Sequence, residues 1–227
     1  MYTDRELEHL VLRWQSGKAG WALTQPRIRQ FSLPKDYFNC THLIEGGRWL
    51  IFATLYGSVK YQDLNASGDV SDSVTLVPTL FDEEIIVNTR LCVDMDPDAE
   101  YLTFNLGIMT SPRRQRDHPE FPNPPRFARW IQVIRVTSDV DENGEVTGLR
   151  AECLARFREE YLCGCDSFTL RGHYVAYSLY TFEPTPILND GESVAIVDWT
   201  LVHSTSLAYP RKLICRRRAE VSHMSFI

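Results

Sequence analysis

The chain has 227 residues, with 24 Lys and Arg against 30 Asp and Glu, and 44% of its residues are hydrophobic. This composition can bury a core and excludes a wholly disordered chain. The net charge of −6 argues against a protein that coats nucleic acid, so we expect no nucleic-acid partner. No stretch approaches the roughly 20 apolar residues of a membrane-spanning helix, and we expect no membrane partner.

The compartment follows from the first residues and from the cysteines. Asp4, Glu6 and Glu8 interrupt the start of the chain, which is not the pattern of a secretory signal. Six cysteines in 227 residues are too sparse for a disulfide-scaffolded secreted domain. We therefore expect an intracellular protein, cytoplasmic or nuclear and not secreted, with reduced thiols.

The first predicted element is an amphipathic helix within residues 1–31. Thr3 followed by Glu6 forms a capping box, and Gly17 ends the pattern. The apolar positions i, i+3, i+4 and i+7 make one stripe, formed by Leu7, Leu10, Val11 and Trp14. Such a stripe needs a surface to pack on, either the domain that follows or a domain further upstream. We assign residues 1–31 to this helix and a linker.

From residue 32 onward the pattern changes to short β runs separated by turn residues. Alternating or continuous apolar runs of three to nine residues are bounded by Gly, Pro, Asn and Asp, as expected for strands and tight turns. The predicted strands cover residues 49–54, 58–64, 74–77, 85–93, 101–106, 130–136, 149–157, 168–170, 174–180, 193–199 and 212–215.

These strands recur as a repeated unit of a turn, an aromatic-led strand, a second turn and another strand. The run that begins at Gly47 aligns with the run that begins at Gly172, and the segment ending at Asp63 aligns with the one ending at Asp198. A diverged third copy lies between them. The residues assigned to this repeated motif are Gly46, Gly47, Trp49, Gly57, Asp63, Tyr101, Trp130, Gly172, Tyr174, Asp198 and Trp199.

Repetition of such a unit is typical of propeller blades, whereas a β-sandwich predicts short strands without it. The predicted fold class is all-β, a partial or irregular β-propeller of about three to four WD-like blades preceded by one N-terminal helix. Because closed propellers need at least four blades, we expect residues 32–227 to be part of a longer ring.

The motifs around Gly46-Gly47-Arg48-Trp49, Gly57-Ser58-Val59 and Asp63-Leu64 resemble the first blade of the mushroom-type fungal F-box protein family. The resemblance covers most of the chain from about Pro26 onward, and no F-box is visible before Thr3. In that family the F-box binds the Skp adaptor of a cullin ubiquitin ligase, and the repeat region recruits substrates. The resemblance thus implies a substrate-recognition region, with the Skp adaptor as a partner only if an F-box lies upstream.

Patterns that carry catalytic or metal chemistry were sought and are incomplete. Residues 139–144 match the first half of a calcium loop, but Arg150 stands where a bidentate carboxylate is required, so a hairpin is the preferred interpretation. The Cys163-Gly-Cys165 pair lacks the second pair of a zinc site, and two ordinary cysteines are preferred. We expect no enzyme activity, no catalytic residue, no cofactor and no metal. A propeller-shaped hydrolase or lectin is a third, disfavoured interpretation.

The most distinctive loop contains Arg113, Arg114 and Arg116, followed by four prolines up to Pro125. Clustered guanidinium groups can hold an acidic or phosphorylated peptide by bidentate hydrogen bonds, and the alternative is a solvated insertion. These arginines are the predicted partner-binding residues. The predicted function is non-catalytic binding of a protein or peptide, as the substrate-recognition region of an F-box type receptor. A stand-alone propeller scaffold unrelated to ubiquitin is the alternative.

Overall fold

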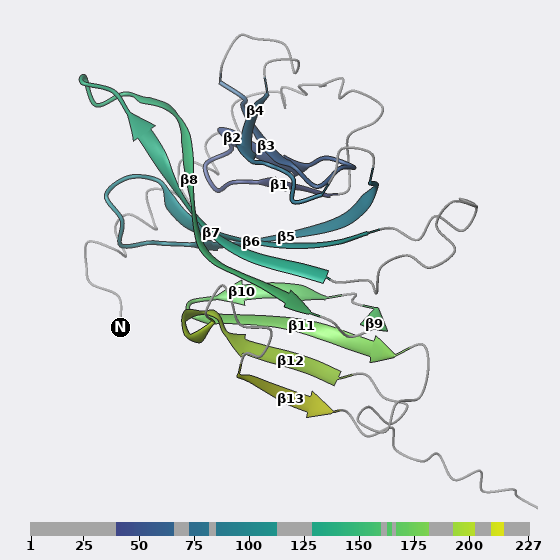
Figure 1. The fold of residues 1–227 in the computed structure, drawn as a ribbon. Helices are drawn as coiled ribbons and strands as arrows, with labels where there is room; N and C mark the ends of the chain where they lie inside the picture. Colours follow the sequence, from purple (N-terminus) through teal and green to yellow (C-terminus); the bar gives the residue numbers. More distant parts are fainter. Residues whose placement is uncertain are drawn as a thin grey trace, which may run out of the picture. The chain divides into compact units, whose positions relative to one another are not determined.

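The computed structural model describes residues 40–65, 73–81, 85–112, 129–159, 163–164, 167–181, 193–202 and 210–215 (Figure 1). The chain divides into two compact units, Met1–Leu33 and Pro34–Ile227, and every described residue belongs to the second. The predicted N-terminal helix lies outside the described residues. Within them, regular structure is antiparallel β-strand apart from one short 3-10 helix, Trp199–Leu201. None of the described helices is long and apolar enough to cross a membrane.

Three sheets of four strands follow one another along the chain, and each is a meander whose strands pair in chain order. The first sheet consists of β1 (Cys40–Leu43), β2 (Trp49–Ala53), β3 (Val59–Asp63) and β4 (Val74–Val77). The middle sheet consists of β5 (Val87–Met95), β6 (Thr103–Pro112), β7 (Arg129–Val140) and β8 (Val146–Glu159). The last sheet consists of β10 (Phe168–Arg171), β11 (Tyr174–Thr181), β12 (Ser193–Asp198) and β13 (Arg211–Cys215), and β9 (Cys163–Gly164) pairs with the end of β11.

The all-β prediction is confirmed for the described residues, although several strand limits differ. The strand predicted at residues 74–77 is β4, whereas β1 and β9 were not predicted. Tyr101 was predicted to begin a strand but lies two residues before β6 and is about half exposed. Trp199 was predicted to end a strand; instead, it starts the 3-10 helix, because the Asp198 carboxylate accepts from the backbone N–H of Thr200 and turns the chain.

The middle sheet is covered on both faces. Alternation along β6 places Phe104, Leu106 and Ile108 in a core shared with the first sheet, where they meet side chains such as Ile51. Met109 belongs to a second core, which the middle sheet shares with the last sheet. A strand buried on both faces needs apolar residues at successive positions, which explains the nearly continuous apolar runs of the sequence. The three sheets therefore form successive layers joined by two hydrophobic cores (Figure 1).

A bulge allows β8 to contribute to both cores. Opposite β7 the register shifts between Val133 and Ile134, so that Leu154 is an extra residue. Before the bulge Leu149 belongs to the core shared with the first sheet, and after it Phe157 belongs to the core shared with the last sheet. Both are odd-numbered, so an unbroken strand would place them on one face. The bulge therefore lets one 14-residue strand contact both neighbouring sheets.

Glycines permit the closest approaches between the sheets. A Cβ on Gly107 of β6 would lie 2.5 Å from the Cys92 Sγ and 3.1 Å from the Phe168 ring of the last sheet. Gly57 has φ of +85° in the β2–β3 turn, and a Cβ there would lie 3.0 Å from the Val87 side chain of the middle sheet. The sequence motif assigned Gly57 to a turn. The structure adds that its lack of a side chain also lets the turn pack against β5.

A buried charged cluster joins the middle and last sheets. The Glu159 carboxylate at the end of β8 is 1% exposed. Arg211 donates to both of its oxygens at 2.9 and 2.8 Å, and the hydroxyl of Tyr177 donates to it at 2.5 Å. Since a buried carboxylate is stable only when its charge is compensated, these contacts fix β11 and β13 relative to β8.

We predict that Glu159→Gln destabilises the protein by about 3 kcal/mol, because the guanidinium of Arg211 loses its compensating charge. Tyr177→Phe, which removes one hydrogen bond, is expected to cost about 1 kcal/mol. Urea unfolding followed by circular dichroism measures both changes. Glu152→Gln is the matched control, an exposed glutamate on the same strand, for which a change within about 0.5 kcal/mol is expected. Equal losses at Glu159 and Glu152 would contradict the assigned role.

Candidate functional site

The same backbone hydrogen bond closes one corner of each sheet. The N–H of Leu64 donates to the carbonyl of Arg48 at 2.7 Å, that of Ser138 to Leu102 at 3.0 Å, and that of Trp199 to His173 at 3.0 Å. Each carbonyl belongs to the residue just before the second strand of its sheet, and each donor lies on or just beyond the third strand. The corners therefore give a structural alignment of the three sheets that does not depend on side-chain type.

This alignment agrees with part of the sequence repeat and corrects one position. Trp49 lies opposite Asp63 and Tyr174 lies opposite Asp198, so the two segments that the repeat aligned form equivalent strand pairs. In the middle sheet the equivalent position is Thr103, opposite Thr137, and not Tyr101. The sequence alignment followed aromatic character, but Tyr101 belongs to the turn, and the first strand residue is a buried threonine. Trp130 lies on β7, near the other end of that strand.

In the first corner Arg48 contacts two sheets. Its Nε and Nη2 donate to the Asp63 carboxylate at 3.0 and 2.7 Å, and Nη2 also donates to the carbonyl of Val146 on β8 at 2.9 Å. The hydrogen bond to Asp63 raises the pKa of the Arg48 guanidinium above its usual value. The guanidinium lies 4.6 Å from the ring centroid of Trp49, and this ring packs edge-on against Tyr61. These contacts make the predicted motif residues Trp49 and Asp63 structural.

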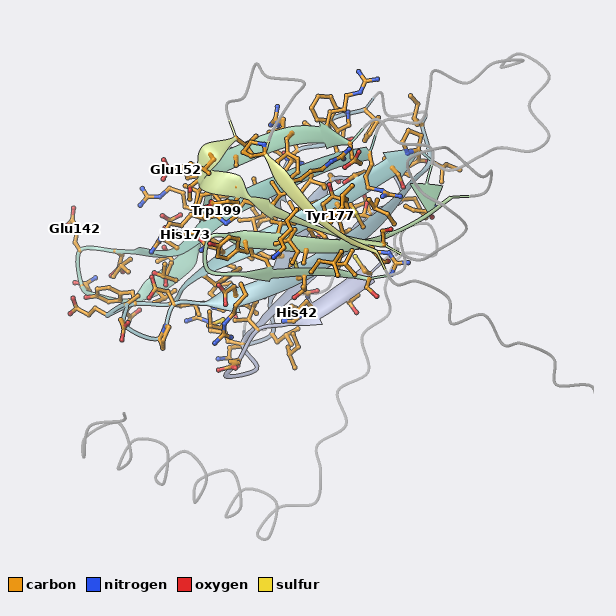
Figure 2. All side chains as sticks on the ribbon, turned by 90° about the horizontal axis from the view of Figure 1, so that it is seen from below. His42, Glu142, Glu152, His173, Tyr177 and Trp199 are labelled. Carbon is orange, nitrogen blue, oxygen red and sulfur yellow. The ribbon has the colours of Figure 1, made fainter. Side chains whose placement is uncertain are left out.

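The last corner is more exposed. Gly172 has φ of +52°, its N–H donates to the Asp94 carboxylate of β5 at 2.7 Å, and its carbonyl accepts from the indole of Trp199 at 2.9 Å. The rings of His173 and Trp199 meet edge-on with centroids 5.9 Å apart. Figure 2 shows these two rings together at one end of the last sheet. Tyr174 is 55% exposed beside them, so this corner exposes aromatic surface.

Carboxylates concentrate at this end of the sheets. In a meander the turns after the first and third strands lie at the same end, and Figure 2 shows Glu142, at the tip of the β7–β8 hairpin, on the same side as His173. The arginines here form ion pairs, including Arg135 with Asp96 at 2.8 Å. We call this the acidic end, whose described carboxylates are Glu45, Asp63, Asp94, Asp96, Asp98, Glu100, Asp139, Asp141, Glu142, Glu145, Glu152 and Asp198.

The acidic end was not identified from the sequence. Its carboxylates are distributed over residues 45–198 and form no linear motif. The signal that could have identified this end is the position of the carboxylates in the sequence. They lie in or next to the turns that follow the first and third strands of each meander. By contrast, the predicted partner-binding residues Arg113, Arg114 and Arg116 lie outside the described residues, in the connection between Pro112 at the end of β6 and Arg129 at the start of β7.

The segment that resembles a calcium loop forms the β7–β8 hairpin. Val140 pairs with Val146, and Gly144 has φ of +81°, so the hairpin interpretation is confirmed. The Asp141 carboxylate accepts from the backbone N–H groups of Asn143 and Glu145 at 2.9 and 2.8 Å. The bond from Glu145 is the main reason that the pKa of Asp141 lies below its usual value. This carboxylate serves the turn as a hydrogen-bond acceptor.

The cysteines whose side chains the structure describes form no disulfide bond. Cys40, Cys92 and Cys153 are free thiols, and the described residues contain no group of three metal-ligating side chains. Cys163 lies in β9, whereas Cys165 is outside the described residues. Burial raises the pKa of Cys40 to about 11 and that of Cys92 to about 12. Since the thiolate is the reactive form, burial makes both thiols poor nucleophiles.

We predict that iodoacetamide at pH 8 modifies the exposed Cys153 at least tenfold faster than Cys92. The rate at Cys92 should rise about tenfold per pH unit, because the thiolate fraction increases with pH up to the pKa. Mass spectrometry of peptides from the folded protein measures both rates, and the unfolded protein in urea is the control. Equal rates in the folded protein would show that Cys92 is accessible and its pKa ordinary.

Comparison with known proteins gave no match, neither to a family model, nor to a curated protein, nor to a solved structure. The three sheets themselves supply the features that bear on function. Their shared corner, their two joint cores and the chemistry of their ends are the observations on which a function can be proposed.

Proposed function

We propose that the chain is a non-catalytic protein-recognition module of the β-propeller type. The observation that carries this proposal is the corner hydrogen bond, which recurs at Arg48, Leu102 and His173 in three successive four-stranded meanders. Recurrence of one corner marks each sheet as a copy of one unit. Stacked copies of a four-stranded meander are the units from which propellers are built.

The contacts between first strands support a radial arrangement. β5, the first strand of the middle sheet, contacts β1 of the first sheet and β10 of the last sheet. In a propeller the first strands of the blades surround the central axis, and the outer strands diverge. Under this proposal the three sheets are WD-like blades of a partial or irregular propeller, preceded by the predicted amphipathic helix of residues 1–31.

Recognition in such a fold uses the turns at the ends of the sheets, because a rigid scaffold holds them in place. The acidic end offers carboxylates beside the exposed ring of Tyr174. The connection after Pro112, which contains the three predicted arginines, leaves from the opposite end of β6. We propose that an acidic or phosphorylated peptide is bound through Arg113, Arg114 and Arg116 of this connection.

The more specific role follows from the resemblance to the fungal F-box family. We propose that the chain is the substrate-recognition region of an F-box type receptor of a cullin ubiquitin ligase. The alternative is a stand-alone scaffold unrelated to ubiquitin. Both roles need the same fold, and they differ in whether the protein is connected to the Skp adaptor.

We predict that the product of the complete gene co-purifies with the Skp adaptor, whereas residues 32–227 alone do not. Affinity purification of both tagged proteins from a fungal host, followed by immunoblotting for the adaptor, measures this. Absence of the adaptor from every preparation would favour the stand-alone scaffold. Circular dichroism of the purified proteins is the control for folding.

We predict that replacing Arg113, Arg114 and Arg116 together with Ala lowers capture of phosphopeptides at least tenfold. The physical reason is the loss of bidentate hydrogen bonds to phosphate oxygens. Binding of a phosphopeptide library to wild-type and variant protein, measured by mass spectrometry, provides the comparison. A matched variant at three exposed arginines of the described strands, Arg150, Arg156 and Arg171, should leave capture unchanged. Unchanged capture by the first variant would refute the arginine site.

A further inference from the structure

The first and last sheets share a pair of side chains at their corners. An aromatic residue begins the second strand of each sheet and lies opposite an aspartate that ends the third strand. The pairs are Trp49 with Asp63 and Tyr174 with Asp198. Residues directly opposite each other on antiparallel strands share one face of the sheet, with Cβ atoms about 5 Å apart. Each pair therefore places an aromatic ring beside a carboxylate.

The backbone holds the two aspartates in the same way. The Oδ1 of Asp63 accepts from the N–H of Asn65 at 2.9 Å, and that of Asp198 accepts from the N–H and hydroxyl of Thr200 at 3.1 and 2.6 Å. In both sheets the residue two positions before the aromatic one is a glycine with positive φ, +75° and +52°. The two corners therefore share one backbone arrangement, in which Oδ2 of each aspartate remains for a second donor.

The first corner shows what such a pair binds. Oδ2 of Asp63 accepts from Nε and Nη2 of Arg48 at 3.0 and 2.7 Å. The guanidinium carbon of Arg48 lies 4.6 Å from the ring centroid of Trp49. A guanidinium that is hydrogen-bonded to a carboxylate and lies over an aromatic ring combines an ion pair with a cation–π interaction. The pair is thus a guanidinium site, and in the first sheet the preceding residue fills it.

The equivalent residue does not fill the site in the last sheet. The position of Arg48 is taken by His173, whose ring packs edge-on against Trp199. Within the described part of the chain, Thr200 is the donor to the Asp198 carboxylate, and both of its hydrogen bonds end at Oδ1. The oxygen that corresponds to the acceptor of the Arg48 guanidinium is therefore available.

The aromatic ring of the last pair is also accessible. Tyr174 is 55% exposed, whereas Trp49 is 4% exposed. Arg171 lies opposite Tyr174 on β10, but its guanidinium is directed to Asp94, at 3.9 Å. The surrounding carboxylates of the acidic end favour a cation at this corner. Ring and carboxylate thus repeat the first corner without its guanidinium.

The middle sheet shows that the corner itself does not need this pair. Thr103 and Thr137 occupy the equivalent positions there. The corner hydrogen bond still forms, from the N–H of Ser138 to the carbonyl of Leu102. The aromatic–carboxylate pair is therefore an addition to the repeated backbone, and ligand binding accounts for it where no neighbouring side chain uses it.

We propose that Tyr174 and Asp198 form a binding site for the guanidinium group of an arginine side chain. Oδ2 of Asp198 accepts its N–H groups, and its plane lies over the Tyr174 ring, as in the first corner. A planar guanidinium suits this geometry better than the compact ammonium of lysine. The arginine comes from outside these 227 residues or from another part of them, and the test distinguishes the two. The inference does not depend on the proposed recognition function.

The test is a titration of the nitrogen-15-labelled 227-residue chain with N-acetyl-arginine methylamide, followed by NMR. The indole N–H of Trp199, which donates to the carbonyl of Gly172 at this corner, is the reporter. We expect it to shift with a dissociation constant on the order of millimolar, as for one exposed side chain. N-acetyl-citrulline methylamide has a similar shape without the charge and should bind at least tenfold more weakly.

Two substitutions remove the two halves of the site. Asp198→Asn removes the charge but keeps an oxygen for the hydrogen bonds from Thr200, and Tyr174→Leu removes the ring. Each should weaken arginine binding at least tenfold. The matched controls Glu142→Gln and Tyr101→Leu change an exposed carboxylate and an exposed tyrosine of the same end, outside the pair, and should alter the affinity less than twofold.

His173→Arg tests the equivalence of the two corners directly. It places a guanidinium at the position that Arg48 has in the first sheet, so the new side chain should occupy the site. We expect arginine binding to fall at least tenfold, while the circular dichroism spectrum stays that of the wild type. Undiminished binding in a folded His173→Arg variant would contradict the assignment.

The source of the arginine follows from the same titration. Binding to the wild-type chain shows a site open to an arginine from outside the 227 residues. Binding that appears only after Arg171→Gln, or after joint replacement of Arg216, Arg217 and Arg218 with Gln, shows that the chain fills its own site.

Absence of binding in the wild type and in both of these variants would overturn the proposal. It would also be overturned by binding that Asp198→Asn and Tyr174→Leu leave unchanged, or by citrulline binding as tight as that of arginine. If Asp198→Asn fails to fold, Tyr174→Leu keeps the test decisive, because it changes an exposed side chain.

Discussion

Burial of the middle sheet on both faces is the constraint on which the rest of the structure depends. Phe104, Leu106 and Ile108 point to one neighbour, and Met109 points to the other. Removing this apolar area from water supplies the main favourable free energy of the arrangement. It also requires one sheet on each side, so the layering of the three sheets follows from the composition of β6, β7 and β8.

Polar contacts then fix how the layers meet, because apolar packing alone does not determine a unique alignment. Arg48 reaches the carbonyl of Val146, and Asp94 accepts from the N–H of Gly172. The buried Glu159 connects β8 with Tyr177 and Arg211. Each contact joins two successive sheets near an end of the strands. The charges are thus placed where a shifted register would leave them unpaired.

The acidic end depends on the same repetition. Three equivalent corners place turns of different sequence side by side at one end, and this produces the acidic end from carboxylates that are distant along the chain. Repetition also explains why the last sheet exposes the face of Tyr174 and Val194, because a unit that contacts its neighbour through one face carries that face at the last position too. Both surfaces are therefore consequences of one repeated unit.

The local structure could be predicted from the amino-acid sequence. The alternation of apolar and polar residues, the turn residues and the repeat around Trp49 and Tyr174 predicted an all-β chain. They also predicted individual strands such as β4 and the β7–β8 hairpin. These depend on interactions between residues close in the chain, which the pattern records directly. Tyr101 was misplaced because aromatic character was taken as the marker of a strand start, whereas a backbone hydrogen bond defines the corner.

Only the tertiary structure decided which residues of different sheets meet. The Glu159 cluster joins residues 18 and 52 positions apart, and the pairing of Asp94 with Gly172 spans 78. The bulge at Leu154 changes which face the later residues of β8 occupy, and no local pattern marked it. Such contacts arise when apolar faces stack and bring polar groups within reach. Their partners are set by the geometry of packing, and a linear pattern carries no record of that geometry.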